Sequence, residues 1–424
     1  MKNHLSKEAY FWLEYICFLT QKHHKLFGPV WWYSLVHEKN IFKSTSFHNF
    51  FKVNFPDNKW IRIKATLGGV KKYLSFMYRY LNAPRRDTNF KWRLLVSYGE
   101  SHLKRFEDAG EALIVAIPTK NNYKRLMVDD KYRLIDEWLT LKDFFIVAVR
   151  YFQTLFTFIF KTSFLVPEDY PGKHKLTVKF LLECIKEDWW RSFAGDVLVE
   201  GLFFERMFKD LEKQGRGKIS EVIYCYEGLG WEKMLCLAFK NYNKRGSLQS
   251  AVGQNTLQYY YLPDELKIMP RPDEIDVCGS VSFEVMSEFY GKNNILAIGD
   301  LRGNVKDFLT NFKKDDIIKE KTVAILGPVK EMNDELIEWT KQNREDFMVK
   351  RHMDDKTDYG YKVMKDFYSE LNNIKEVISY SSTLAIEAAA IGIKVVIPEL
   401  PSFMNLGLIG LGENLNKHFL GCVL

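Results

Sequence analysis

The sequence has few cysteines, and their positions give no sign of a metal site or a disulfide framework. Six cysteines are scattered over 424 residues without the paired spacings of zinc sites. We interpret those in apolar stretches as small buried side chains, which indicates a reducing compartment. The N-terminus also lacks the uninterrupted apolar run of a signal peptide, because Glu8 and Glu14 interrupt it. We therefore expect a cytoplasmic protein that is not secreted.

Nucleic-acid-binding motifs, internal repeats and low-complexity segments are missing as well. The 61 Lys and Arg residues are dispersed among 54 Asp and Glu, for a net charge of +7, with no helix-turn-helix, zinc-finger or RNP pattern. We interpret them as a solvated surface and expect no nucleic-acid partner. No Asp-x-Asp signature follows a strand, and the pair Asp354-Asp355 is interpreted as loop or capping residues. We predict no metal and no cofactor.

Strand and helix signals alternate along the chain. The composition is 46% apolar, and 424 residues suffice for two or three domains with full cores. Longer periodic stretches predict helices over 132–162 and 176–213. Short apolar runs predict strands at 92–97, 112–117, immediately before Glu227, 247–252, 276–279, 295–298, 322–326, 347–352 and 395–397. This alternation predicts an α/β fold, with an N-terminal α/β domain carrying extra helices over 1–290 and a C-terminal Rossmann-like nucleotide-binding domain over 291–424.

The segment 377–397 has the pattern of a phosphate site. An apolar strand is followed by Ser381, Ser382 and Thr383, then by an alanine-rich helix that closes at Gly392. Hydroxyl side chains cap helix N-termini, where unpaired amide groups and the helix dipole favour an anion. Glu387, one turn along, has two interpretations: a solvated carboxylate, or an acceptor for ribose hydroxyl groups.

Two further segments place polar side chains at the ends of predicted strands. Lys350, Arg351 and His352 form the carboxyl end of the short strand predicted over 347–352, where a histidine can exchange protons near neutrality and cations suit a phosphate or carboxylate ligand. Glu227 and Gly228 follow another strand, and a partly buried carboxylate there could serve as a general base for an acceptor hydroxyl. The alternatives are a surface or capping histidine and a glutamate that only caps the next helix.

These three segments together resemble the GT-B-fold glycosyltransferases of bacterial surface carbohydrates that use cytidine-activated sugars, including capsule Kdo transferases and sialyl- and polysialyltransferases. That family has an acid-Gly motif, a Lys-x-His-Pro motif and a Ser-Ser motif. The matching positions are Tyr226-Glu227-Gly228, Lys350-Arg351-His352-Met353 and Ser381-Ser382. Trp231-Glu-Lys233 and the stretch that ends at Arg302 also look like this family, and the likeness spans about 185–400. Tyr226 stands where the family has an acid, and Met353 stands where it has proline.

The resemblance implies two Rossmann-like domains facing a central cleft, and metal-independent, inverting transfer from a CMP-linked sugar, Kdo or sialic-acid-like, to a glycan or lipid-linked glycan. Its setting would be capsule, O-antigen or lipooligosaccharide synthesis. It implies Glu227 as the base and His352 as the residue that stabilises the leaving phosphate. The residues implied to bind nucleotide are Lys350, Arg351, Ser381, Ser382, Thr383 and Glu387, and those implied to contact substrate are Gly228 and Arg302.

Residues 144–160 are apolar over nearly the length of a membrane helix. Arg150 and Gln153 argue against crossing, because a central arginine costs about 2.5–3.5 kcal/mol on insertion. We therefore favour a core helix over a membrane-surface helix, and both over a span. Peripheral contact with the inner face of the cytoplasmic membrane remains an alternative.

Other functions stay open on the same scaffold. One is a teichoic-type polyol-phosphate transferase with a CDP-linked donor, and a related sugar-nucleotide epimerase is a weaker variant. Another is a noncatalytic carbohydrate-binding or assembly subunit, which the departures at Tyr226 and Met353 would favour.

Overall fold

The computed structural model describes most of the helices and strands that the sequence predicts. The described residues are 27–33, 58–98, 111–119, 121–161, 178–226, 228–248, 270–277, 283, 286–287, 290–297, 320–327, 330–352, 355–380, 382–390 and 392–398. Glu227, Arg302, Met353, Asp354 and Ser381 lie outside them.

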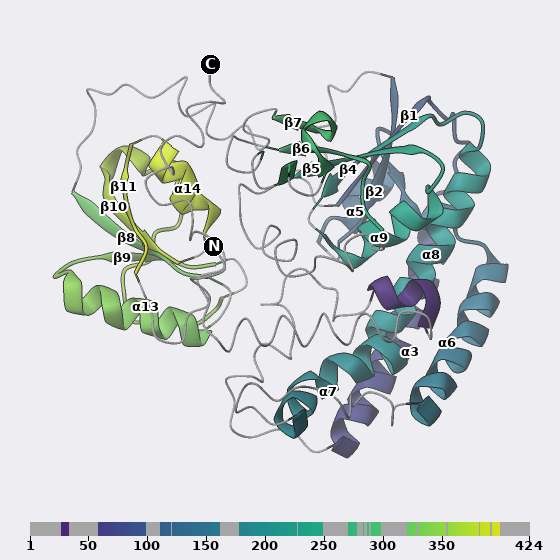
Figure 1. Ribbon diagram of the computed structural model, residues 1–424, viewed down its shortest axis with the longest axis horizontal. Helices are drawn as coiled ribbons and strands as arrows, with labels where there is room; N and C mark the ends of the chain where they lie inside the picture. Colours follow the sequence, from purple (N-terminus) through teal and green to yellow (C-terminus); the bar gives the residue numbers. More distant parts are fainter. Residues whose placement is uncertain are drawn as a thin grey trace. The chain divides into compact units, whose positions relative to one another are not determined.

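The larger of two sheets has seven strands in the order β3-β2-β1-β4-β5-β6-β7 (Figure 1). Its strands are β1 (Arg93–Tyr98), β2 (Ala112–Ile117), β3 (Arg133–Leu134), β4 (Glu221–Tyr226), β5 (Asn243–Leu248), β6 (Glu274–Val277) and β7 (Ile295–Ala297). The pairs β1–β2, β1–β4, β2–β3 and β6–β7 are parallel. The chain adds β2 and β3 on one side of β1 and then crosses to β4 on the other. In such sheets this reversal marks where ligands bind.

Continuous apolar runs form the central strands because both faces of a parallel sheet are covered. Leu94, Leu95 and Val96 of β1 are all buried, as are Val222 and Tyr224 of β4. The covering helices are α5 (Tyr123–Val128) and α9 (Gly230–Ala238), and short 3-10 helices occur at η2 (Gly28–Tyr33), η5 (Ile135–Trp138) and η8 (Lys292–Asn294).

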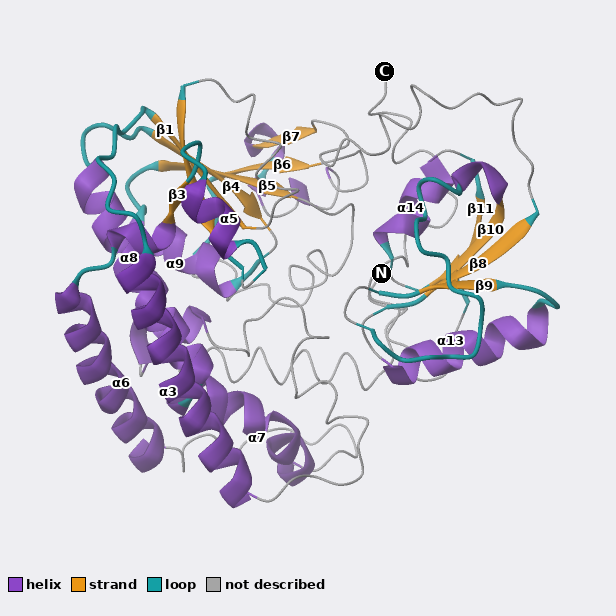
Figure 2. Ribbon diagram, turned by 180° about the vertical axis from the view of Figure 1, so that it is seen from behind, coloured by secondary structure: helices purple, strands orange, loops and turns teal. Residues whose placement is uncertain are grey.

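Four longer helices form a separate layer, with α8 (Asp196–Gly215) as its central member. The other three, α3 (Asn58–Asn82), α6 (Leu141–Lys161) and α7 (Val178–Ala194), each pack against α8 (Figure 2). Phe203 of α8 stacks on Phe76 of α3 with ring centroids 4.4 Å apart, and it meets Phe144 of α6 at 5.1 Å. Stacked aromatic side chains therefore hold these helices together.

The smaller sheet has the order β11-β10-β8-β9, and all three strand pairs are parallel. Its strands are β8 (Lys321–Ile325), β9 (Met348–Lys350), β10 (Ile374–Ser379) and β11 (Lys394–Val396), and its helices are α13 (Lys330–Asn343), α14 (Thr383–Ala390) and the 3-10 helix η10 (Leu371–Asn373). Ala385, Ala388 and Ala389 of α14 pack with Val323 and Val377 on one face of the sheet. Small side chains let this helix lie close to the strands.

The chain divides into two compact units. One contains Leu13–Ser247 and Tyr261–Glu274, and the other contains Met1–Trp12, Leu248–Tyr260 and Ile275–Leu424. Strand β7, after residue 290, still pairs with β6 of the larger sheet. The domain boundary at residue 290 stays a prediction.

The predicted α/β class is confirmed by these two sheets, whereas two helix predictions were wrong in their limits. The helix predicted over 132–162 begins only at Leu141, because residues 133–138 form β3 and η5. The helix predicted over 176–213 breaks at Gly195, which is extended. A Cβ at Gly195 would lie 3.0 Å from the carbonyl oxygen of Ala65 in α3, so close helix packing requires glycine there.

Two strand predictions differ from the structure in their limits. A strand lies at Asn243–Leu248, and residues 249–252 of the strand expected at 247–252 lie outside the described residues. The strand expected at 347–352 ends at Lys350. Arg351 and His352 therefore follow the strand, as a binding residue at the carboxyl edge would.

Candidate functional site

The smaller sheet has its own reversal of strand order, between β8 and β10. After β8 the chain adds β9 on one side, and it then returns to place β10 on the other. In doubly wound sheets the loops that follow these two neighbouring strands diverge and leave a crevice for a ligand. Leu326 and Gly327 follow β8, and Tyr380 and Ser382 follow β10. The predicted serine turn thus lies at the position where this topology binds ligands.

A buried polar cluster joins the two sides of this reversal point. Asn333 of α13 is fully buried, and its Oδ1 accepts hydrogen bonds from the Gly327 amide at 2.8 Å and from the Tyr380 hydroxyl at 2.8 Å. Its Nδ2 donates to the Gly327 carbonyl at 2.9 Å and to Asp355 Oδ2 at 3.0 Å. A Cβ at Gly327 would overlap the Tyr380 hydroxyl oxygen, so this close approach requires glycine. The cluster ties the loops after β8, β9 and β10 together.

Asp355 supplies the negative charge of this cluster. Its Oδ2 accepts from the Tyr359 hydroxyl at 2.8 Å, and its Oδ1 accepts from the Thr357 amide at 2.9 Å. Burial by itself raises the pKa of the Asp355 carboxyl, but the hydrogen bonds from Thr357, Tyr359 and Asn333 outweigh it and leave the pKa lowered. Burial and the bond to Asp355 raise the pKa of Tyr359 to about 12. Asp355 is thus held ionised, and Tyr359 is held protonated as a donor.

The serine turn caps α14 as the sequence predicts. Ser382 Oγ accepts a hydrogen bond from the Leu384 amide at 3.2 Å, in the manner of an N-cap residue. The Ser382 amide in turn donates to Ser379 Oγ at 3.3 Å. Thr383 is the first residue of α14 and Glu387 lies within it, and nothing is described of their side chains. The turn therefore has a helix N-terminus and a partly positive dipole end available for an anion.

The basic residues after β9 lie at the same edge of the sheet. Lys350 Nζ donates to the Lys365 carbonyl at 2.6 Å, and Arg351 Nη1 donates to the Thr357 carbonyl at 3.2 Å. His352 is half-buried, and its carbonyl accepts from the Asp355 amide at 3.0 Å. Strands β9 and β10 flank β8, so their carboxyl ends stand about 10 Å apart, two strand spacings. His352 and Ser382 thus follow the two strands on either side of β8.

The larger sheet places the predicted base segment at its own reversal point. Tyr226 ends β4 and is buried, and Gly228 has φ 76°, a left-handed conformation that suits glycine. The Gly228 amide donates to Glu232 Oε2 at 2.7 Å, and the Glu232 side chain is buried in the first turn of α9. Glu227 lies between Tyr226 and Gly228 in the sequence and is outside the described residues. Tyr226, the last residue of β4, lies at the carboxyl edge of the sheet on the strand next to β1.

Several residues of these two sites were missed by sequence reasoning. Asn333, Tyr359 and Tyr380 belong to no motif, and Glu232 was noted only within Trp231-Glu-Lys233. Asp355 accepts from the Thr357 amide in a loop, as interpreted, but its place in the buried cluster was not foreseen. Their signal is spatial, since residues 327, 333, 355 and 380 meet only when the sheet forms. Among the described residues there is no group of three or more His, Cys, Asp or Glu side chains arranged to hold a metal ion.

Comparisons with known proteins leave the family open. No family model matches the chain, and no curated protein matches it. Among solved structures, it is similar to a UDP-N-acetylglucosamine 2-epimerase from Rickettsia bellii, with a TM-score of 0.39 and 11% identity over 73% of this chain and 80% of that one. It is also similar to the glycotransferase of kitacinnamycin (TM-score 0.35, 10% identity, 74% and 81% coverage) and to the wall teichoic acid polymerase TagF (TM-score 0.34, 9% identity, 77% and 78% coverage).

Proposed function

We propose that this chain is a glycosyltransferase of the GT-B type that transfers a sugar, with inversion, from a CMP-linked donor to a glycan acceptor of a bacterial surface polysaccharide. The observation that supports it is the coincidence of motif and topology. The serine turn follows β10, and the acid-Gly turn follows β4, so each lies at the reversal point of its own sheet.

In the proposed mechanism the smaller sheet binds the nucleotide. The N-terminus of α14, capped by Ser382, faces the donor phosphate, and His352 stabilises the charge that develops on it as CMP leaves. The cluster around Asn333 holds the surrounding loops in place, so these groups are preorganised. Glu227 accepts the proton of the acceptor hydroxyl as the new glycosidic bond forms at the anomeric carbon. The proposed reaction needs no metal or cofactor, and we propose a cytoplasmic setting.

Calorimetric titration with CMP, CDP, UDP and GDP tests the donor class. We expect CMP to bind tightest, and the double variant Ser381→Ala, Ser382→Ala to lose at least tenfold in affinity. Ser369→Ala is the matched control, because this exposed serine lies in the same unit away from the reversal point. Preference for UDP or GDP would contradict the CMP donor, and equal losses in the control would contradict the role of the turn.

The general base is tested separately, by turnover. Glu227→Gln should reduce turnover by about 10²–10⁴-fold and leave CMP affinity unchanged, because a general base contributes to the chemical step. Near-normal turnover under conditions where chemistry limits the rate would refute this role. Transfer that leaves phosphate in the product would identify the CDP-linked polyol-phosphate transferase instead.

One observation favours the noncatalytic alternative. Lys350 and Arg351 both donate to backbone carbonyls, so these contacts serve the loop itself. Under this alternative no nucleotide would bind in the titration, even with a glycan acceptor present.

A further inference from the structure

The outer face of α3 exposes an apolar stripe of unusual length. Its large side chains recur at alternating spacings of three and four residues, and their exposed fractions run from 37% at Met77 to 71% at Leu81. The stripe consists of Trp60, Ile63, Leu67, Val70, Leu74, Met77 and Leu81. The opposite face is buried through Ile61, Ala65 and Phe76. The helix is therefore apolar on two sides, one packed against the protein and one exposed.

The same helix is strongly basic. Residues 58–82 contain six basic side chains and no Asp or Glu: Lys59, Arg62, Lys64, Lys71, Lys72 and Arg79. Lys71 and Lys64 are exposed along one border of the stripe, where Lys64 Nζ also lies 3.4 Å from Glu187 of α7, and Lys59 and Arg62 are exposed on the other side. Lys72 and Arg79 form ion pairs with Glu200 and Asp136 on the packed side. An exposed apolar stripe bordered by Lys and Arg is typical of helices that lie on an anionic membrane surface.

Helix α6 exposes a second apolar face. Its exposed large side chains are Leu141, Phe145, Val149, Phe152, Phe156, Ile159 and Phe160. By length and composition alone, Leu141–Phe160 could cross a membrane, although 22% of it is buried in the protein. Its predicted role as a core helix is therefore correct for one face only.

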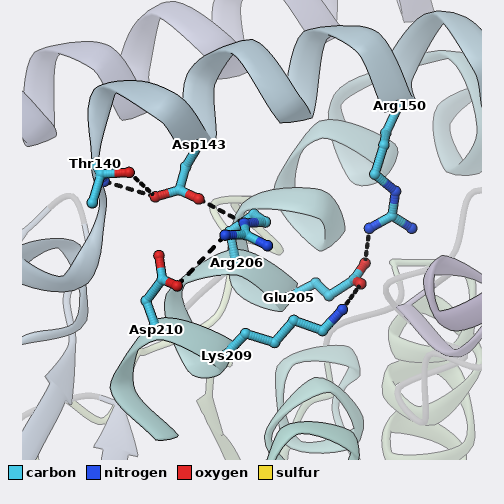
Figure 3. A network of polar contacts seen from close by, with 7 residues as sticks. All are labelled: Thr140, Asp143, Arg150, Glu205, Arg206, Lys209 and Asp210. Atoms are coloured by element: carbon cyan, nitrogen blue, oxygen red, sulfur yellow. Dashed lines mark hydrogen bonds and ion pairs between the residues drawn. The ribbon is translucent and has the colours of Figure 1, made fainter. Parts of the chain in front are cut away.

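The charges of α6 show which way it faces. Figure 3 shows Arg150 directed at Glu205 of α8, with Nη1 and Oε2 2.5 Å apart, while Lys209 binds the other carboxylate oxygen. Asp143 likewise binds Arg206 of α8 at 2.6 Å. Asp143 and Arg150 thus pair with α8, and the exposed side of α6 beyond Lys142 consists mainly of large apolar side chains. A helix held in this way is suited to lying on a bilayer, whereas a span would have to break these pairs.

We propose that the exposed faces of α3 and α6 are a docking surface for an anionic lipid bilayer. The basic borders of α3 would bind acidic headgroups, while Trp60, Leu67, Leu74 and the phenylalanines of α6 insert among the upper acyl chains. The proposal does not depend on the transferase activity, although a membrane-bound position would suit a lipid-linked acceptor.

Charge argues against a second copy of the chain as the partner. The stripe of α3 has the spacing of a coiled-coil seam, and Lys64, Lys71 and Lys59 lie at the positions that flank such a seam. In coiled coils these flanking positions usually pair with residues of opposite charge on the partner helix. In a parallel pair Lys59 would face Lys64 of the other copy, and in an antiparallel pair Lys64 would face Lys71. Either pairing sets like charges against each other, whereas an anionic membrane neutralises them.

Co-sedimentation of the full chain with vesicles tests the proposal. Vesicles of equal parts phosphatidylcholine and phosphatidylglycerol should bind the protein, and pure phosphatidylcholine should bind it much less. Leu67→Glu with Leu74→Glu should abolish binding, whereas Val128→Glu, at a side chain 73% exposed on α5, should leave it unchanged. Phe152→Ser with Phe156→Ser tests the face of α6, and it should weaken binding at least tenfold.

The electrostatic part has its own pair of variants. Lys64→Gln with Lys71→Gln should lower affinity for anionic vesicles by about fivefold per lysine, because a basic residue near such a surface contributes about 1 kcal/mol. Lys124→Gln with Lys341→Gln, exposed lysines elsewhere, should have no effect.

Three results would overturn the proposal. The first is equal binding to neutral and anionic vesicles, and the second is a loss of binding in the control variants as large as in the α3 variants. The third is a dimer in light scattering that Leu67→Glu with Leu74→Glu dissociates while the original protein ignores vesicles.

Discussion

Replacement of Asn333 by alanine should be the most damaging single change at the smaller sheet's reversal point. The substitution leaves the Gly327 amide and the Tyr380 hydroxyl buried without their acceptor. Each unsatisfied buried donor costs about 1–3 kcal/mol, so the two together predict a loss of about 4 kcal/mol. Tyr380→Phe removes a single hydrogen bond and leaves Asn333 Oδ1 bonded to Gly327, so it should cost only about 1 kcal/mol.

The assay is urea unfolding together with hydrogen exchange of peptides that cover residues 320–350. Local exchange is needed because two compact units need not unfold together. Asn343→Ala is a matched control on the same helix, because this exposed asparagine donates to the Trp339 carbonyl one turn earlier and lies outside the buried cluster. The reasoning fails if Asn333→Ala destabilises this region no more than Tyr380→Phe or Asn343→Ala.

Asn333→Asp adds a test of the electrostatics. The new carboxylate would face Asp355 Oδ2, which lies 3.0 Å from the amide nitrogen that it replaces. Burial and this like charge would raise its pKa in the folded state above the unfolded value. The loss of stability relative to the original protein should therefore be smallest below about pH 4, and it should grow as pH rises through the folded pKa. A loss that does not change with pH would show that the carboxylate turns away from Asp355.

Two further predictions concern the same unit. The Arg344 guanidinium, 2.5 Å from Glu376, and Lys394 lower the pKa of the Glu376 carboxyl to about 2. The ionised carboxylate therefore adds about 3 kcal/mol to the free energy of unfolding above pH 4.5, and this contribution is lost as pH falls toward 2. Arg344→Gln should flatten this acid dependence in unfolding curves, and an unchanged curve would contradict the assignment. Gly327→Ala places a methyl group against the Tyr380 hydroxyl oxygen, so it should lower thermal stability, and Tyr380→Phe in the same chain should restore part of the loss; no recovery would indicate a different clash.

Helix and strand identity was largely readable from local pattern. The runs at 92–97, 112–117 and 322–326 became β1, β2 and β8 within about a residue or two, because continuous β-branched and leucine runs suit strands covered on both faces. The predicted helix ends were wrong where tertiary packing sets them, as at Gly195, whose backbone lies against α3. The exposed stripe of α3 was missed for a related reason, since periodicity marks an apolar face without telling what covers it.

Local sequence patterns were enough to predict the α/β class, the strands that end at the serine turn and at the acid-Gly turn, and the cap at Ser382, because these depend on neighbours within a few residues. The strand orders, and with them the strand ends that meet at a reversal point, follow only from the folded structure. The same holds for the cluster of Asn333, Asp355, Tyr359 and Tyr380 and for the pairing of Arg150 with Glu205. Hydrogen bonds between residues tens of positions apart form only once the sheets and helices pack, so no local sequence pattern can predict them.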